Sequence, residues 1–150
     1  MQDETLDPMT RALEQARAAD ARGEVPVGAV LVASGRIIAA AGNATRDPPD
    51  PTGHAEIRVI RQGALLLGQE RLTDCDLYVT LEPCAMCAAA ISFARIRRLY
   101  FGASDPKGGA VDNGPRFFAS PTCHHAPEVY SGFQERAAAA LLSDFFATRR

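Results

Sequence analysis

Two short clusters of potential metal ligands constrain this chain more than any other feature. The segment GHAEI occupies residues 53–57 and EPCAMC occupies residues 82–87. Cys84 and Cys87 are three positions apart, so a helix that starts here places both thiols on one face of its first turn. The free backbone N–H groups and the dipole at that end favour anions and lower the pKa of a thiol. The pair therefore suits either a metal ion or a redox-active C-x-x-C.

His54 favours the metal. With two thiolates it forms a donor set suited to Zn²⁺, and three protein ligands leave the fourth tetrahedral position to water, as in catalytic zinc sites. Zinc can lower the pKa of such a water from about 15.7 to about 7. Glu56 lies two residues after His54, so it points elsewhere than the ligand and can reach that water. We predict that His54, Cys84 and Cys87 bind one zinc ion and that Glu56 is the catalytic proton shuttle.

Two other interpretations of the clusters stay open. A redox C-x-x-C has no need of a distant H-x-E. A structural zinc site would recruit a fourth protein ligand, and Glu56 would then be an ordinary acid at the start of a helix. The candidates for that fourth ligand, whose roles the sequence does not assign, are Cys75, Cys123, His124 and His125. The default for both additional cysteines is a buried thiol.

Size and charge limit the class of protein. The chain has 150 residues, which suits a single domain over residues 1–150 with a substantial core. No apolar run approaches the roughly 20 residues that span a bilayer, and the start MQDETLDPMT lacks the features of a signal peptide, so we expect a cytoplasmic protein. The net charge of -2 argues against unspecific nucleic-acid binding. Residues 90–150 nevertheless hold 7 Arg and one Lys against 5 acids, which leaves a local basic surface or ordinary solvated faces as alternatives.

Strands and helices alternate along the predicted order of elements. Strands are expected within 25–43 (two, joined at Ser34 and Gly35) and at 76–81, 96–102 and 128–132. Helices are expected at 10–23, from about His54 onward, at 83–95 and at 133–150. The candidate caps of the second helix are Asp50, Thr52 and Gly53. Residues 103–127 form a long irregular segment of a kind that is usually functional or mobile. This order predicts an α/β fold with a mixed sheet and helices on both faces.

Five segments carry a resemblance that covers almost the whole chain, from about Thr10 to Arg150. They are EVPVGAVLV, DPTGHAEI, LYVTLEPCAMCAAAISFARI, FGASDPKGGA and LLSDFF. H-x-E followed by P-C-x-x-C is the signature of zinc deaminases of nucleobases. Together the segments resemble the bacterial tRNA-specific adenosine deaminases of the cytidine deaminase-like superfamily. The resemblance implies a three-layer α/β/α fold with a five-stranded mixed sheet, a homodimer with one Zn²⁺ per subunit, and conversion of the wobble adenosine (position 34) of a tRNA anticodon stem-loop to inosine.

The resemblance also implies roles for residues outside the two clusters. Asn43 would hydrogen-bond the flipped base, and Val27 and Ala29 would shape its pocket. Asp105 would meet the nucleotide sugar or backbone, with Lys107 nearby. The residues expected to touch the anticodon loop are Phe145, Phe146, Arg149 and Arg150. The pattern alone favours other roles for two of these residues, because Phe145 follows Leu141 by four positions on an apolar helix face and Asn43 suits a turn.

The chain departs from the family pattern at several positions. Gly53 stands where Ala is usual, Ser104 stands where a basic residue is common, and residues 110–132 differ in sequence. These departures leave the tRNA isoacceptor and the RNA contacts of residues 103–127 open.

Two competing functions share the predicted zinc site. One is deamination of guanine or cytosine as free base or nucleoside, and the other is a zinc-stabilised interaction module without catalysis.

Overall fold

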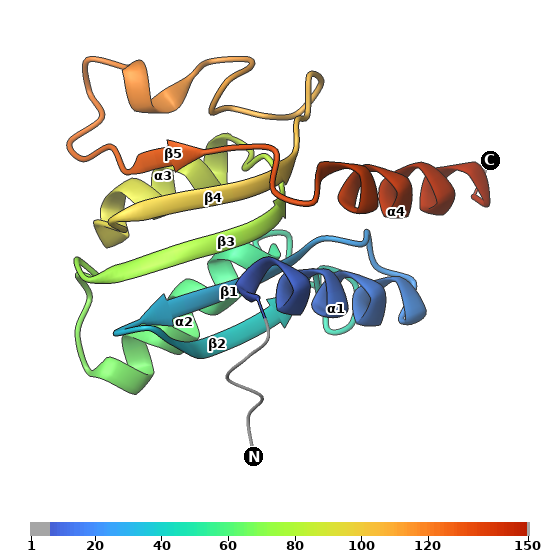
Figure 1. The fold of residues 1–150 in the computed structure, drawn as a ribbon, viewed down its shortest axis with the longest axis horizontal. Helices are drawn as coiled ribbons and strands as arrows, with labels where there is room; N and C mark the ends of the chain where they lie inside the picture. Colours follow the sequence, from blue (N-terminus) through green and yellow to red (C-terminus); the bar gives the residue numbers. More distant parts are fainter. Residues whose placement is uncertain (1–6, 150) are drawn as a thin grey trace.

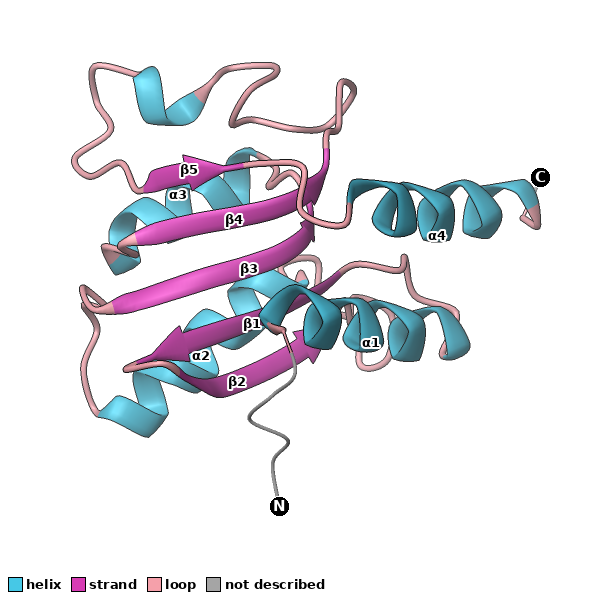
Figure 2. Cartoon of the chain, in the orientation of Figure 1, coloured by secondary structure: helices cyan, strands magenta, loops and turns pink. Residues whose placement is uncertain are grey.

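The computed structural model describes residues 7–149, which form three layers (Figures 1 and 2). A five-stranded sheet has the order β2-β1-β3-β4-β5. Helices α1 (Pro8–Ala21) and α4 (Glu135–Ala147) lie on one face, and α2 (Ala55–Leu67) and α3 (Ala85–Ala94) lie on the other (Figure 1). The predicted α/β class with helices on both faces is confirmed.

The sheet is mixed, as predicted. Strand β1 (Gly28–Ala33) pairs antiparallel with both β2 (Arg36–Gly42) and β3 (Cys75–Leu81). Strands β4 (Arg98–Ala103) and β5 (Glu128–Tyr130) extend it in parallel from β3. The parallel connection from β3 to β4 passes through α3, and the chain passes from β2 into α2. Both helices therefore begin at the end of the sheet where β2 and β3 finish (Figure 1).

The main core lies between the sheet and the α2–α3 layer. Leu31, Leu77 and Leu99 from three adjacent strands are fully buried there, together with Val59 of α2 and Ile91 of α3. A second cluster around Met9 packs α1 against the opposite face of the sheet. Burial of these apolar side chains on both faces fixes where α2 and α3 begin, and so where the residues at their first turns lie.

The segment after β4 is more ordered than an irregular sequence suggests. It contains a 3₁₀ helix, η1 (Phe117–Ala119), whose first N–H donates to the carbonyl of Ala110 at 2.7 Å. Further along, the ring Nε2 of His125 lies 2.7 Å from the carbonyl oxygen of Ile96, and the Sγ of Cys123 lies 3.5 Å from the Oγ of Ser92. These contacts hold the segment against the end of α3.

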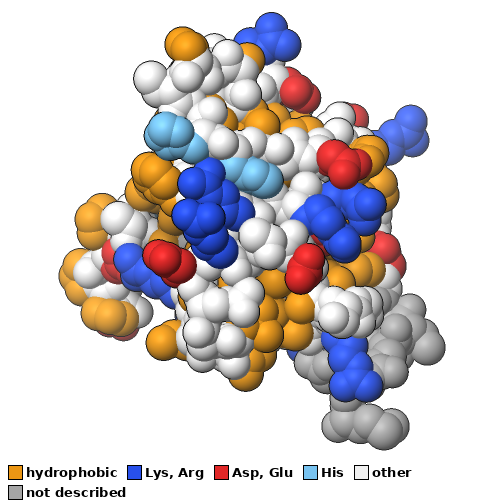
Figure 3. Space-filling view, turned by 90° about the vertical axis from the view of Figure 1, so that its left-hand side faces the viewer, with side chains coloured by type: hydrophobic (Ala, Val, Ile, Leu, Met, Phe, Trp, Pro, Cys, Tyr) orange, Lys and Arg blue, Asp and Glu red, His pale blue; other side chains and the backbone are white. Residues whose placement is uncertain are grey.

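The end of the sheet opposite the starts of α2 and α3 carries mixed charges. Basic, acidic and histidine side chains are interspersed there (Figure 3). Arg97 pairs with Asp76 at 3.0 Å, and Arg98 pairs with Glu128 at 3.7 Å. Asp76 is buried and accepts two hydrogen bonds from Arg97, whereas the Arg98–Glu128 pair is exposed, so the charges of both arginines are balanced locally. This face thus fits the solvated alternative better than a continuous basic surface. Within residues 7–149, no helix combines the length and the apolar character needed to cross a bilayer.

Candidate metal centre and pocket

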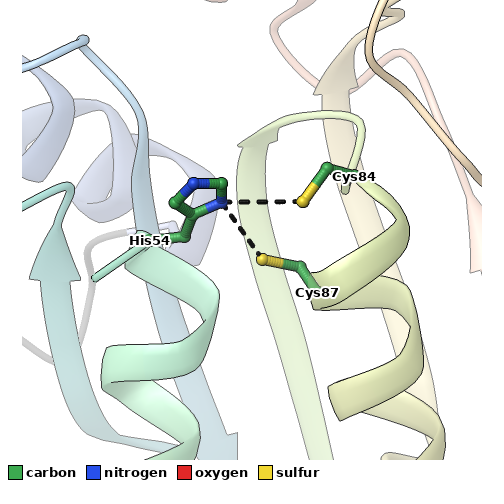
Figure 4. Close-up of side chains that lie close together, drawn as sticks. All are labelled: His54, Cys84 and Cys87. Carbon is green, nitrogen blue, oxygen red and sulfur yellow. Dashed lines mark hydrogen bonds between the residues drawn. The ribbon is translucent and has the colours of Figure 1, made fainter. Parts of the chain in front are cut away.

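His54, Cys84 and Cys87 converge between the first turns of α2 and α3 (Figure 4). His54 is the N-cap residue of α2, Cys84 is the N-cap residue of α3, and Cys87 lies in the first turn of α3. The Nδ1 atom of His54 lies 3.6 Å from the Sγ of Cys84 and 3.4 Å from the Sγ of Cys87. All three donor atoms lie within 4.8 Å of one another.

The spacing of these atoms fits a tetrahedral zinc ion. Zn–N and Zn–S bonds of about 2.0 and 2.3 Å place a nitrogen and a sulfur ligand about 3.5–3.6 Å apart at tetrahedral angles. The two observed separations of 3.6 and 3.4 Å are close to that value. Among the described residues this is the one group of three donor side chains that could hold an ion. Its donor set of one imidazole and two thiols matches the preference of Zn²⁺.

Hydrogen bonds among the three donors shift their pKa values in different directions. Donation from the Cys87 thiol lowers the pKa of Cys84 to about 4, while the same hydrogen bond and burial raise the pKa of Cys87. The hydrogen bond with Cys84 raises the pKa of His54 against the effect of burial. The three side chains thus hold protons between them, and metal binding to such ligands displaces protons.

The cap predicted for α2 is wrong. None of Asp50, Thr52 and Gly53 is the N-cap, because Asp50 Oδ1 instead accepts from the N–H and hydroxyl of Thr52 and closes the preceding turn. The N-cap is His54, whose side chain makes no capping hydrogen bond. Asn43, at the end of β2, supplies the missing acceptor, since its Oδ1 receives the N–H of Ala55 at 2.9 Å. This bond fixes the Asn43 side chain and leaves its amide NH₂ group as a donor.

Glu56 lies in the first turn of α2 beside the donor cluster and is 4% exposed. Burial raises the pKa of Glu56 to about 7 from its ordinary value of 4.5, and the charge of His54 offsets this only in part. A carboxyl group whose pKa lies close to neutral can both accept and return a proton. The predicted position of Glu56, next to the ligands but not among them, agrees with this geometry.

A pocket of about 230 Å³ opens onto the cluster. It is smaller than the roughly 300–1,000 Å³ of typical drug-sized ligand sites, which suits a single base. Apart from the zinc ligands, four of its lining residues were predicted as site residues, namely Val27, Asn43, Glu56 and Asp105. The remaining lining residues are Val25, His54, Leu81, Glu82, Cys84 and Gly108.

Other predicted contact residues lie elsewhere. Ala29 is fully buried in the main core and does not line this pocket, and Lys107 is exposed. Phe145 is 6% exposed and lies under the guanidinium of Arg149, 3.7 Å from the ring centre, so the pattern-based expectation of a packed Phe145 is confirmed. Phe146 is 49% exposed on α4, which extends from the same end of the sheet (Figure 1). Arg150 falls outside the described residues.

The four candidates for a fourth ligand all lie outside the donor cluster. Cys75 is buried at the start of β3, and Cys123 and His125 contact the end of α3. His124 is exposed. Since no other described His, Cys, Asp or Glu joins the cluster, the structure offers no support for a closed structural zinc site.

Two buried carboxylates of the pocket region, Glu24 and Glu82, were not predicted. Glu24 accepts the N–H groups of Thr45 and Arg46 at 3.0 and 3.1 Å. Glu82 is 2% exposed, and burial alone would raise its pKa, but the N–H of Asp105 and the amide of Asn113 lower it overall. The signal for Glu82 is its place at the end of a buried strand, where an acid is rare unless it has partners.

Comparisons with known proteins agree with this geometry. The profile of the cytidine and deoxycytidylate deaminase zinc-binding region matches residues 2–103. The tRNA-specific adenosine deaminase of Agrobacterium fabrum is 65% identical over 142 residues, covering 95% of this chain and 93% of its own.

Solved structures show the same fold. One, from studies of A-to-I editing by tRNA:A34 deaminases at the wobble position of transfer RNA, is 66% identical with a TM-score of 0.89 and covers 90% of this chain and 98% of its own. A guanine deaminase from Bacillus subtilis is 33% identical with a TM-score of 0.65, covering 99% of this chain and 94% of its own.

Proposed function

Because the chain belongs to the tRNA-specific adenosine deaminases, within the cytidine and deoxycytidylate deaminase family, we propose that it converts the wobble adenosine (position 34) of a tRNA anticodon loop to inosine. The observation that carries this proposal is the convergence of His54, Cys84, Cys87 and Glu56 on one pocket, in a chain 65% identical to a tRNA-specific adenosine deaminase. The reaction is a hydrolysis, in which water adds at C6 of adenine and ammonia leaves.

His54, Cys84 and Cys87 would hold the zinc ion. When bound, the ion would act as a Lewis acid and make a water molecule acidic enough to lose a proton near neutral pH. Glu56 takes that proton and passes it to N1 of the adenine ring, and it then carries the proton of the hydroxyl group added at C6 to the leaving amino group, which departs as ammonia. Its burial beside the ligands supports this role, because solvent has little access to the carboxyl group.

Asn43 would orient the base. Its Oδ1 is engaged by the N–H of Ala55, so its NH₂ group is the side that faces a ligand in the pocket. A fixed donor of this kind selects a base that presents an acceptor at the matching position. Val27 and Leu81 would pack against the faces of the ring. The target base must be splayed out of the anticodon loop to reach them, as loop bases readily are.

The anticodon loop would contact the exposed part of α4. Phe146 of α4 and Arg149, which follows the helix, are both exposed, and α4 extends from the end of the sheet where the pocket opens (Figure 1). An exposed aromatic ring suits stacking on an unstacked base, and a guanidinium suits a phosphate. Phe145 contributes through packing under Arg149 and not as a contact residue.

Replacing Phe146 by Ala should reduce kcat/KM for an anticodon stem-loop by about fivefold or more, since stacking of one base contributes about 1–3 kcal/mol. The thermal unfolding midpoint should barely change, because half of the ring is already exposed. Unchanged turnover of the stem-loop would remove Phe146 from the proposed RNA contact.

The same proposal includes a homodimer. Leu65 and Leu66 of α2 and Phe93 of α3 are 86%, 64% and 71% exposed, and both helices lie on one face of the sheet. Large exposed apolar side chains on one surface are typical of protein interfaces. Sedimentation that shows only monomers at micromolar concentration would contradict this part of the proposal.

The decisive experiment compares substrates. Purified zinc-loaded protein is incubated with an anticodon stem-loop carrying adenosine at position 34, with the same stem-loop carrying guanosine there, and with free guanine and cytosine. Inosine and ammonia should form with the first substrate alone. Release of ammonia from guanine, with an unreacted stem-loop, would favour the activity named for the Bacillus subtilis relative.

A further inference from the structure

The carboxylate of Glu82, which directly follows β3, accepts hydrogen bonds from several backbone and side-chain groups. Its Oε1 accepts from the N–H of Asp105 at 2.9 Å and from the side-chain amide of Asn113 at 2.7 Å. Its Oε2 accepts from three consecutive backbone N–H groups, at residues 111, 112 and 113, at distances of 3.1, 2.8 and 3.1 Å. The hydroxyl of Ser104 lies 3.4 Å from Oε1. One carboxylate thus holds both ends of the segment 104–113.

The segment closes tightly around this carboxylate. A Cβ atom added to Gly109 would lie 2.4 Å from the Cδ of Glu82 and 2.6 Å from the carbonyl oxygen of Asp105. The next residue, Ala110, donates its N–H to the carbonyl of Pro83 at 2.9 Å. The close approach requires a glycine, and it brings the segment against the start of α3.

The same segment forms one wall of the pocket. Asp105 and Gly108 line the pocket together with Glu82 itself. Asp105 Oδ1 accepts from the N–H groups of Lys107 and Gly108, at 3.2 and 3.0 Å, so its side chain is oriented by the local backbone. That backbone is in turn held by Glu82 through the N–H of Asp105.

We infer that Glu82 is a positioning residue of the substrate pocket, whose buried carboxylate fixes residues 104–113 so that Asp105 and Gly108 form a preset wall for the incoming nucleotide. The inference rests on the proposed function, because the wall matters for catalysis only if a nucleotide enters the pocket. Glu82 does not touch the reacting atoms and acts through Asp105.

Glu82→Gln tests the acceptor pattern with little change in shape. Each oxygen of Glu82 accepts at least two N–H groups. In either orientation of the new amide, its NH₂ group therefore replaces an accepting oxygen and leaves those N–H donors facing another donor. Glu24→Gln is the matched control. Glu24 is also buried and accepts backbone N–H groups, but from Thr45 and Arg46, next to Asn43.

Hydrogen exchange tests the inference without any substrate. In zinc-loaded Glu82→Gln, amides within 104–113 should exchange about tenfold or more faster than in the wild type, while those of 43–54 stay unchanged. In Glu24→Gln, amides of 43–54 should exchange faster than in the wild type, while those of 104–113 stay unchanged. Unchanged exchange in 104–113, or loss of zinc from Glu82→Gln, would overturn the inference even if the protein deaminates no RNA at all. If this variant does not fold, Asn113→Ala removes one donor, and unchanged exchange in 104–113 there overturns the inference equally.

A double-mutant cycle then tests the link to catalysis. Glu82→Gln alone should lower kcat/KM for the stem-loop about tenfold, but less than about twofold in an Asp105→Ala background, because the two residues act in series. Glu24→Gln should lower it equally in both backgrounds. Equal effects of Glu82→Gln in both backgrounds would show that it acts on something other than Asp105. An inactive wild type would contradict the proposed function and leave the exchange result to decide the inference.

Discussion

Replacing Glu56 by Ala should lower the rate of deamination by about 10²–10⁴ or more, because the variant lacks the group that moves protons between water, N1 and the leaving ammonia. Zinc content should stay at one ion per chain, since Glu56 is not among the three donors. The fold should persist, because Glu56 is 4% exposed and removing a buried carboxylate also removes the cost of its desolvation. Inosine formation, zinc analysis and thermal unfolding on one preparation measure all three.

Glu135→Ala is the matched control for this result. Glu135 is also an acid in the first turn of a helix, but it is exposed on α4 and outside the pocket. Its replacement should leave turnover within about twofold of the wild type, as is usual for surface substitutions. A Glu56→Ala variant that remains fully active would show that the shuttle is another group.

Replacing Cys87 by Ala should abolish zinc binding and activity together. Loss of hydrogen-bond partners around a metal ligand already costs about 10–100-fold in metal affinity, so loss of a direct ligand should cost at least about 100-fold. Cys87 is fully buried, and no other His, Cys, Asp or Glu of the described residues joins the donor group to replace it. Elemental analysis after dialysis should find little zinc in the variant.

Cys75→Ala separates this effect from the loss of any buried cysteine. Cys75 is 1% exposed and lies at the start of β3, outside the donor cluster. It should cost some stability through the cavity it leaves, but it should keep zinc and activity. Full zinc occupancy in Cys87→Ala would contradict the assigned ligand set.

Local chemistry explains which elements could be predicted. The turn between β1 and β2 was predicted from Ser34 and Gly35, and both adopt the positive φ that such a turn needs. Helix α1 begins at Pro8, two residues before the predicted start, because Asp7 and Pro8 supply the cap and the first position. Strand β5 has only three residues, and its pairing with β4 depends on contacts that no local pattern reveals.

The same distinction between local patterns and distant contacts applies to the residues of the site. His54, Glu56, Cys84 and Cys87 could be predicted because helical spacing places them at two helix starts, and only the meeting of those helices needed the structure. Glu24 and Glu82 could not, because their partners lie about 20–30 positions further along the chain. The burial of Ala29 and the capping role of Asn43 also arise from contacts between distant segments.

The pocket is lined both by helix starts and by loops, which has a consequence for how such enzymes diversify. His54, Glu56 and Cys84 line it from two helix starts, whereas Asn43 and Asp105 line it from separate loops, one held by Glu24 and the other by Glu82. A change in a connection can therefore reshape what the cavity admits while the hydrolytic machinery beneath stays intact. A shared scaffold whose members are named for different purines is the outcome that this modular construction allows.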